Sequence, residues 1–292
     1  MMKTYKYITV LILTLALFAC SNDDSLLSED GEQVSMTFHP QLAGDLHTRA
    51  FGDILNIDRL RIFVYEGQER LSKIFTYTED WETAQQYGIT LNLVKGRSYR
   101  LLFWAEVEGN DAYHITQDGK VSVDYTDAYT QGGFAKMEKM DAFYGTSSII
   151  VGSHVSGVRN VSLTRPFAQL NFMDNAVPPV AGTHKATVTY HDIPVQFNPF
   201  TGEVTKRSSN DITFEFADFT TETMEVNGSL CYYVASNYLF APEVGTTTVS
   251  ATIQLQRVTG SSLSTKSIEF KNEKAIILER NKKTNVVGSL MP

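Results

Sequence analysis

The six histidines are the residues best suited to metal binding or acid–base chemistry, and they are scattered along the chain. Local zinc sites place histidines one helical turn apart or combine them with cysteine and carboxylate ligands. The nearest pair, His184 and His191, has only Asp192 beside it. The GxSxG turn of serine hydrolases, the GxxxxGKS or GxxxxGKT phosphate loop and a GxGxxG helix start are also missing. The sequence therefore predicts no catalytic residue, no metal ligand and no cofactor, and it favours a binding or structural protein over an enzyme.

The first twenty residues end in a cysteine whose thiol can carry a lipid. A basic start is followed by the apolar run 7–18, which is typical of a secretory signal rather than of a fold element. Residues 17–20 (LFAC) resemble a bacterial lipobox. The resemblance implies that residues 1–19 are a lipoprotein signal peptide and that Cys20 anchors the chain to the outer membrane through acyl chains, each buried methylene adding roughly 0.8 kcal/mol. The alternative is a plain signal peptide with an incidental cysteine.

The composition fits a packed globular protein. The chain is 42% hydrophobic and holds 17 Phe and 14 Tyr, which suits packed cores, and beyond the signal no apolar run approaches the ~20 residues that span a bilayer. Without the signal, 23 basic residues face 33 acidic ones, and this balance argues against nucleic-acid binding, which needs clustered Lys and Arg. If Cys20 is acylated, Cys231 has no partner, and its β-type surroundings predict a buried small hydrophobe.

Apolar and polar residues alternate along most of the chain, which predicts half-buried strands. Residues 99–107 are apolar on both faces and should form a central strand, while Asn227-Gly228 favours a tight hairpin. One short helix is expected between Asp80 and Gly88, and a second over residues 137–143. The fold class is therefore all-β. Clear examples of the alternation are Val34, Met36 and Phe38, then Leu60, Ile62 and Val64, then Ile89, Leu91 and Leu93.

A break in the pattern divides the chain into two halves. Pro178 and Pro179 follow a polar stretch that starts at residue 174, and two prolines in a row cannot sit inside a sheet ladder. On each side there are roughly seven strands, enough to close a sandwich of about a hundred residues. We expect a tether with the first strand over residues 20–49, an N-terminal β-sandwich over 50–174 and a C-terminal β-sandwich over 175–292, joined by a short Pro-containing linker.

Four segments resemble the Bacteroidetes-type fimbrillins, or type V pilins. They are residues 165–172 (RPFAQLNF), residues 280–288 (RNKKTNVVG), residues 48–50 (TRA) and the lipobox. The resemblance implies two tandem transthyretin-like β-sandwiches, with residues 165–172 as the strand that closes the first. It implies a lipoprotein pilin that builds surface fimbriae. The acidic residues just after Cys20 resemble the export signal of surface lipoproteins, with a plain solvated linker as the alternative.

In that family, assembly works by strand replacement. A protease cuts after an arginine, and the first strand leaves together with the tether. Carried over here, cleavage between Arg49 and Ala50 would release residues 20–49 with Val34, Met36 and Phe38, and would expose a groove that a strand of another subunit fills. The alternative is that Arg49 is an ordinary exposed loop residue.

The resemblance implies a structural or adhesive subunit of a cell-surface fimbria, exported as an outer-membrane lipoprotein and assembled by donor-strand exchange. Its partners would be other fimbrial subunits, the outer membrane and a host or bacterial surface ligand. Because the chain stops at Pro292, soon after the last strand, we expect a tip or accessory subunit, unless residues 286–290 act as the donor. The alternative is a permanently lipid-anchored protein that binds glycans or nutrients, with Trp81, Tyr87, Trp104 or Tyr113 stacking on sugars, although Trp104 fits a core position better.

Overall fold

The computed structural model describes residues 31–43, 57–67, 69–77, 81–152, 157–175, 182–217 and 223–292. Strands dominate these residues, so the predicted all-β class is confirmed. The signal peptide, Cys20, Arg49, Ala50 and the proline pair lie outside them. In the described part no helix is long and apolar enough to cross a membrane. The longer helices are α2 (Trp81–Tyr87), α3 (Asp127–Thr130) and α4 (Gly133–Glu138).

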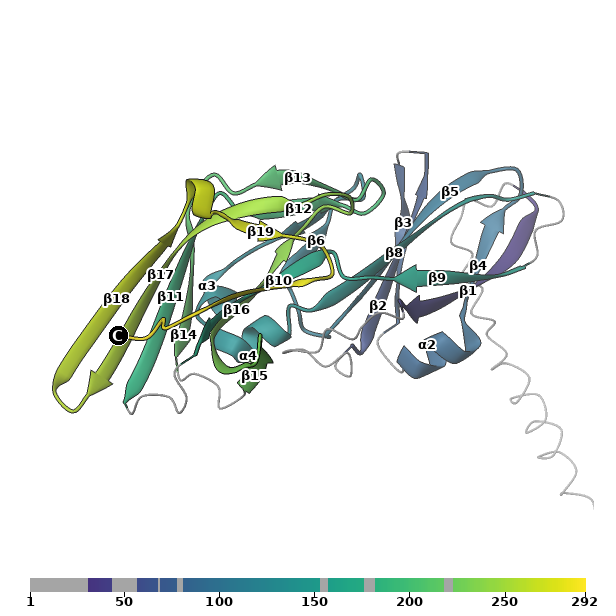
Figure 1. The fold of residues 1–292 in the computed structure, drawn as a ribbon. Helices are drawn as coiled ribbons and strands as arrows, with labels where there is room; N and C mark the ends of the chain where they lie inside the picture. The colour runs from purple at the N-terminus through teal and green to yellow at the C-terminus, as the bar shows by residue number, and fades with distance from the viewer. Residues whose placement is uncertain are drawn as a thin grey trace, which may run out of the picture.

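The first half of the molecule is built from two sheets that enclose one hydrophobic core (Figure 1). One sheet has the strand order β4-β1-β9 and the other the order β3-β2-β5-β8. Strands β5 and β8 run antiparallel over their full lengths, and β9 follows β8 along the chain. The bounds are β1 (Gln33–Leu42), β2 (Arg59–Glu66), β3 (Glu69–Tyr77), β4 (Ile89–Val94), β5 (Ser98–Glu106), β8 (Ala142–Ile150) and β9 (Gly157–Leu163).

The second half surrounds a larger core with three sheets. Their strand orders are β15-β16-β10-β20, β14-β11-β17-β18 with β19 beside β17, and β13-β12-β7-β6. The bounds are β6 (Tyr113–Ile115), β7 (Val121–Val123), β10 (Phe167–Asp174), β11 (Thr183–His191), β12 (Pro194–Asn198), β13 (Glu203–Arg207), β14 (Ile212–Ala217), β15 (Thr223–Val226), β16 (Ser229–Phe240), β17 (Thr247–Thr259), β18 (Ser262–Phe270), β19 (Ile276–Leu278) and β20 (Lys283–Gly288).

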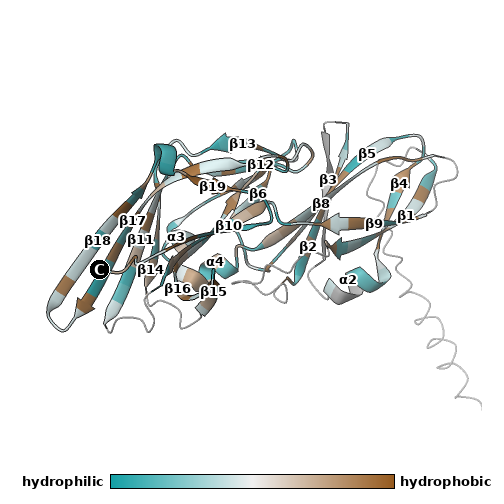
Figure 2. Cartoon of the chain, in the orientation of Figure 1, coloured by the Kyte–Doolittle hydropathy of each residue, from teal (hydrophilic) through white to brown (hydrophobic). Residues whose placement is uncertain are grey.

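The alternation seen in the sequence matches the faces of the strands. Figure 2 shows hydrophobic and hydrophilic residues following each other along β1 and β18. In β1 the buried positions are every second residue, while in β5 the last six positions are all buried. A strand with one face on a core and a strand covered on both faces therefore both occur here, as their sequence patterns predict.

Strand β10 is placed differently from the prediction. It was expected to close the N-terminal sandwich, but it pairs antiparallel with β16 and parallel with β20, both in the second half. Its side chains Phe167, Leu170 and Phe172 belong to the larger core. The family resemblance marks residues 165–172 as a strand, but nothing in the sequence of this strand names its neighbours.

The two halves are also interleaved through the connection between β5 and β8. Strands β6 and β7 and helices α3 and α4 lie in this connection, yet β7 pairs with β12 and the segment packs on the larger core. The expected division at residues 174 and 175 therefore does not describe the strand pairing. The reason is topological, because a chain excursion of some 35 residues carries no sign of which core it will join.

The predicted hairpin and the two predicted helices can each be compared with the structure. Asn227 and Gly228 both have positive φ, 50° and 78°, and connect β15 to β16 as the predicted hairpin. The first helix is confirmed as α2, which is followed by Gly88 at φ 72°. The second expected helix is present as α4, but its expected bounds of 137–143 are wrong, because α4 spans Gly133–Glu138 and β8 begins at Ala142.

Candidate functional site

Strand β1 lies in the middle of its sheet. It runs antiparallel to β4, with Met36 opposite Leu91. On its other side it runs parallel to β9, with Met36 opposite Gly157 and Leu42 opposite Leu163. Both backbone edges of β1 are therefore paired with neighbours. We call the space that β1 occupies between β4 and β9 the seat of β1.

The inward face of β1 carries the residues that the sequence singled out. Met36 and Phe38 are 0% exposed, and Val34 is half-buried against the same core. The Phe38 ring lies 5.6 Å from the ring of Phe103, a core residue of β5. The three alternating apolar residues thus contribute to the core of the first half.

The outward face of β1 is polar. The Ser35 hydroxyl donates to Asn92 Oδ1 at 2.7 Å, and the hydroxyls of Thr37 and Thr90 lie 2.9 Å apart. Nδ1 of His39 lies 3.2 Å from the carbonyl oxygen of Gln85 in α2. These contacts are exposed or half-buried, so they fix the register of β1 more than they stabilise it.

Gly88 allows helix α2 to approach β1 closely. A Cβ atom at this position would lie 2.7 Å from Thr37 Cγ2 and 2.8 Å from His39 Nε2. Its φ of 72° is also one that L-residues rarely adopt. The glycine is therefore required both by its backbone conformation and by the lack of space.

Both ends of β1 are held. At its start, Lys95 Nζ forms an ion pair with Glu32 at 2.6 Å, and the Lys95 amide donates to the Glu32 carbonyl. Just after its end, the Ala43 amide donates to the Leu163 carbonyl at 2.9 Å. Arg49, the predicted cleavage residue, follows six positions later, in the connection from β1 to β2. Cleavage there would leave β1 joined to the rest of the chain through its sheet contacts alone.

A buried charge cluster was missed by the sequence analysis. Glu106 at the end of β5 is fully buried, and its Oε1 lies 2.6 Å from Nη2 of both Arg59 and Arg61, in β2. Trp104 Nε1 donates to the other carboxylate oxygen at 2.8 Å. Burial raises the pKa of Glu106, and the two arginines oppose that rise. The sequence gives little sign of this cluster, because the two arginines and Glu106 are about 45 residues apart in the chain.

Arg165 of the RPFAQLNF segment has a structural role. Its Nε and Nη2 donate to the two oxygens of Asp141 at 2.7 and 2.6 Å, and its guanidinium lies over the Phe143 ring at 4.6 Å. Both partners are largely buried. Burial raises the pKa of the Asp141 carboxyl, and Arg165 opposes the rise. This bidentate pair fixes the chain at the entrance to β10.

The RNKKTNVVG segment lies beside the RPFAQLNF segment, because β20 pairs parallel with β10. Asn281 has a φ of 58°, and its amide donates to the Phe167 carbonyl at 2.7 Å. Arg280 pairs with Glu243 at 3.1 Å and donates to the Tyr144 hydroxyl. Burial raises the pKa of Tyr144 to about 12, although Arg280 opposes the rise. Since Tyr144 belongs to β8, Arg280 connects the two halves.

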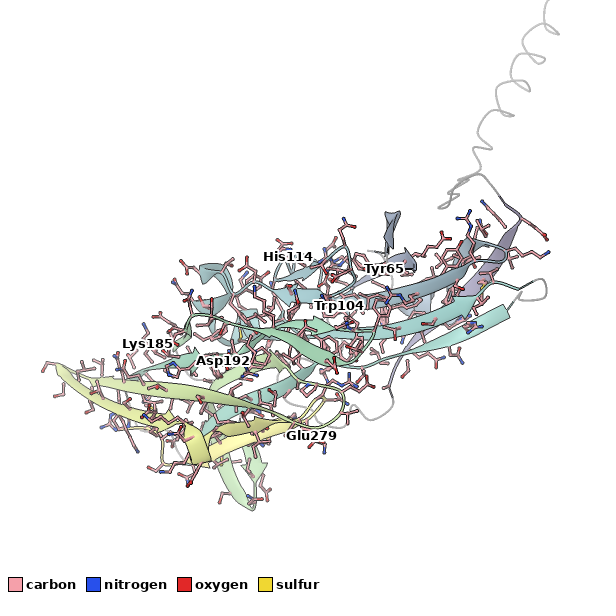
Figure 3. The ribbon with its side chains drawn as sticks, turned by 90° about the horizontal axis from the view of Figure 1, so that it is seen from above. Tyr65, Trp104, His114, Lys185, Asp192 and Glu279 are labelled. Carbon is pink, nitrogen blue, oxygen red and sulfur yellow. The ribbon has the colours of Figure 1, made fainter. Side chains whose placement is uncertain are left out.

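The aromatic residues considered for sugar stacking are mostly not on the surface. Trp104 and Tyr113 are buried in the larger core, with ring centres 5.2 Å apart. Figure 3 shows Trp104 within the body of the molecule. Tyr87 at the end of α2 is 68% exposed, and Trp81 packs partly on the smaller core. Within the described ranges no group of three or more His, Cys, Asp or Glu side chains is placed to hold a metal ion.

These sheets define a fold that is shared with a protein described as a putative adhesin. The crystal structure of a putative adhesin from Bacteroides thetaiotaomicron matches with a TM-score of 0.52 and 12% identity, over 88% of this chain and 92% of that chain. A putative adhesin from Bacteroides ovatus matches with a TM-score of 0.49 and 10% identity, over 90% and 89%. The fimbrial anchor protein Mfa2 from Porphyromonas gingivalis matches with a TM-score of 0.44 and 13% identity, over 87% and 90%.

The chain belongs to DUF6562, a family of unknown function whose model matches residues 28–292. No curated protein matches the sequence. The fold is shared with the putative adhesin from Bacteroides thetaiotaomicron, and the resemblance to the fimbrillins stays a prediction. At about 12% identity a shared fold does not carry a shared function with it.

Proposed function

We propose that this protein is a structural or adhesive subunit of a cell-surface fimbria, anchored through Cys20 to the outer membrane until it assembles. In this proposal β1 fills its seat in the unassembled subunit. Cleavage between Arg49 and Ala50 then frees residues 20–49, and a strand of another subunit takes the place of β1. The observation that carries the proposal is the position of β1, which is central in its sheet, buried through Met36 and Phe38, and followed by the predicted cleavage residue.

The seat of β1 would not stay empty. Neighbouring strands lie about 4.7–4.9 Å apart, so β4 and β9 would be separated by roughly 10 Å, too far to pair with each other. Exposing the contacts of Met36 and Phe38 costs about 1.5–3 kcal/mol for each side chain. The paired backbone groups of β4 and β9 would also lose their partners. An incoming strand would bury apolar side chains in the core again and pair with the backbone groups of β4 and β9. These two gains drive strand replacement.

The seat defines what the incoming strand must look like. It must run parallel to β9 and antiparallel to β4, as β1 does. It needs apolar side chains at alternate positions to occupy the sites of Met36 and Phe38, and polar side chains between them to meet Asn92 and Thr90. Specificity would come from the pockets for alternate side chains and affinity from the backbone ladder.

The alternative function is a permanently anchored surface protein that binds glycans or nutrients. It shares the fold and the anchor with the first proposal, and differs in that β1 stays in place. The exposed ring of Tyr87 is the feature that supports it, since an exposed aromatic side chain offers a flat apolar face to a sugar ring.

Replacing Arg49 with alanine separates these functions. We expect mature surface material from the wild type to begin at Ala50, while Arg49→Ala material keeps residues 20–49 and does not assemble. Arg159→Ala is the matched control, because Arg159 is an exposed arginine in β9 and its loss should leave processing unchanged. N-terminal sequencing and gel analysis of surface material give both readouts. Normal assembly of Arg49→Ala would refute cleavage at this bond, and wild-type surface material that keeps residues 20–49 with a lipidated Cys20 would favour the alternative.

A further inference from the structure

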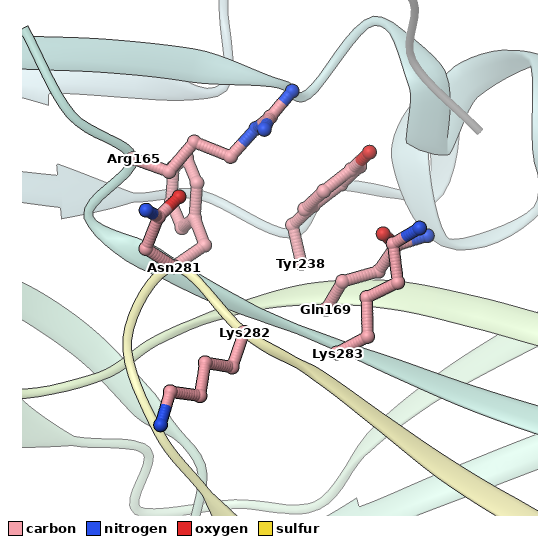
Figure 4. A pocket seen from close by; sticks show the side chains of 7 residues that line it. Arg165, Gln169, Tyr238, Asn281, Lys282 and Lys283 are labelled. Atoms are coloured by element: carbon pink, nitrogen blue, oxygen red, sulfur yellow. The ribbon is translucent and has the colours of Figure 1, made fainter. Parts of the chain in front are cut away.

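A small pocket opens on the sheet β15-β16-β10-β20, away from the seat of β1. Strand register places Tyr238, Gln169 and Lys283 next to each other on the three neighbouring strands β16, β10 and β20. Arg165 and Asn281 line the same pocket from the loops that precede β10 and β20. Figure 4 shows the ends of the Gln169 and Lys283 side chains lying together, while Lys282 points the opposite way.

Among the cations around this pocket, Lys283 is the one without a counter-charge. The guanidinium of Arg165 is held by both oxygens of Asp141. Lys282 forms an ion pair with Glu279 at 2.5 Å. For Lys283, no ion pair or hydrogen bond of the ammonium group is found in the described part of the chain. The pocket therefore carries one excess positive charge.

The surroundings of Lys283 disfavour the charged form of its ammonium group. Burial, and then the nearby charge of Arg165, lowers the pKa of Lys283 to about 8. A half-buried ammonium group without a partner has lost part of its hydration and gained no ion pair in return. An anion in contact with the Lys283 nitrogen would supply the missing ion pair and offset the lost hydration. The geometry thus provides a charged donor next to the end of the Gln169 side chain, which also lines the pocket.

We propose that this pocket binds one carboxylate group of an acidic ligand, with Lys283 as the charged contact. One excess positive charge matches a monoanion better than a phosphate dianion. The cavity volume of about 10 Å³ is close to the space that one water-sized group needs, so the pocket suits a single oxygen of a terminal group. The carboxylate belongs either to an acidic sugar or to a polypeptide, and the two sources share the same chemistry at Lys283.

The test compares two adjacent lysines. Sodium glucuronate and the peptide Gly-Gly-Asp are titrated into the labelled full-length mature chain, with sodium chloride at equal ionic strength as the reference, and the backbone amides of Gln169, Asn281 and Lys283 are followed by NMR. We expect saturable shifts for the wild type and for Lys282→Gln, and at least tenfold weaker binding for Lys283→Gln. Because Lys283→Gln removes a half-buried charge that has no ion pair, it should melt no lower than the wild type.

Each outcome decides the proposal. Tighter binding of glucuronate identifies a saccharide source and tighter binding of the peptide identifies a polypeptide source, and both support a carboxylate site. Shifts that sodium chloride reproduces, shifts that do not saturate, or equal binding by Lys283→Gln and the wild type would overturn it.

Discussion

Replacing Phe38 with alanine is expected to lower the free energy of unfolding by about 3–5 kcal/mol, the range typical of a buried phenylalanine. Phe38 is fully buried, and its ring lies against that of Phe103. The substitution removes this contact and leaves a cavity that the surrounding sheets can fill only in part. Urea unfolding of the uncleaved chain, followed by circular dichroism, measures the change.

A neighbouring residue of β1 provides the control for this prediction. Thr37 lies on the outward face, where its hydroxyl meets Thr90 in an exposed contact. Thr37→Ala should change the free energy of unfolding by well under half of the Phe38→Ala effect, since surface substitutions usually change it by no more than about 0.5 kcal/mol. If Phe38→Ala costs no more than Thr37→Ala, β1 does not occupy the core in solution and the proposed function loses its basis.

Removing the carboxylate of Asp141 is expected to lower the free energy of unfolding by about as much as Phe38→Ala does. Asp141→Ala leaves the largely buried guanidinium of Arg165 without its bidentate partner, and breaking a buried pair in this way costs about 3–5 kcal/mol. The double variant Asp141→Leu/Arg165→Met should recover most of this loss, because it removes both charges and keeps apolar volume. Denaturant unfolding of the wild type and these two variants measures the loss and its recovery.

An exposed ion pair serves as the comparison. Lys185 and Glu215 lie 3.0 Å apart, and each side chain is 42% exposed. Glu215→Ala should cost at most about 1 kcal/mol, because exposed pairs are screened by water and salt. A loss at Asp141 as small as that at Glu215 would show that Arg165 finds another partner or becomes hydrated, and its role at the entrance to β10 would need revision.

The features that follow from local sequence were predictable. The alternation of Val34, Met36 and Phe38 gave the inward face of β1, because side chains of a strand point to opposite sides in turn. The Asn227-Gly228 hairpin and the left-handed conformation of Asn281 follow from the φ that these residues tolerate. The burial of Trp104 was also expected from the apolar strand that contains it.

The features that depend on distant pairing were not predictable. Nothing in the sequence of β10 shows that it joins β16 and β20 rather than the first half. The Glu106 cluster and the Arg280–Tyr144 contact join residues that are far apart along the chain. Lys283 shows the same limit, because its position beside Gln169 arises only from the parallel register of β10 and β20.

The central claim is that the seat of β1 accepts a strand from outside, and peptide exchange tests it most directly. A specific protease site is placed between Arg49 and Ala50, the folded chain is cut, and an isotope-labelled peptide of residues 31–43 is added. Mass spectrometry of the folded complex should show the labelled peptide replacing the original segment, while the same peptide with Phe38→Asp should not replace it. If the cut chain neither releases its own segment nor takes up the labelled one, the seat is a permanent part of the fold and assembly by strand replacement is contradicted.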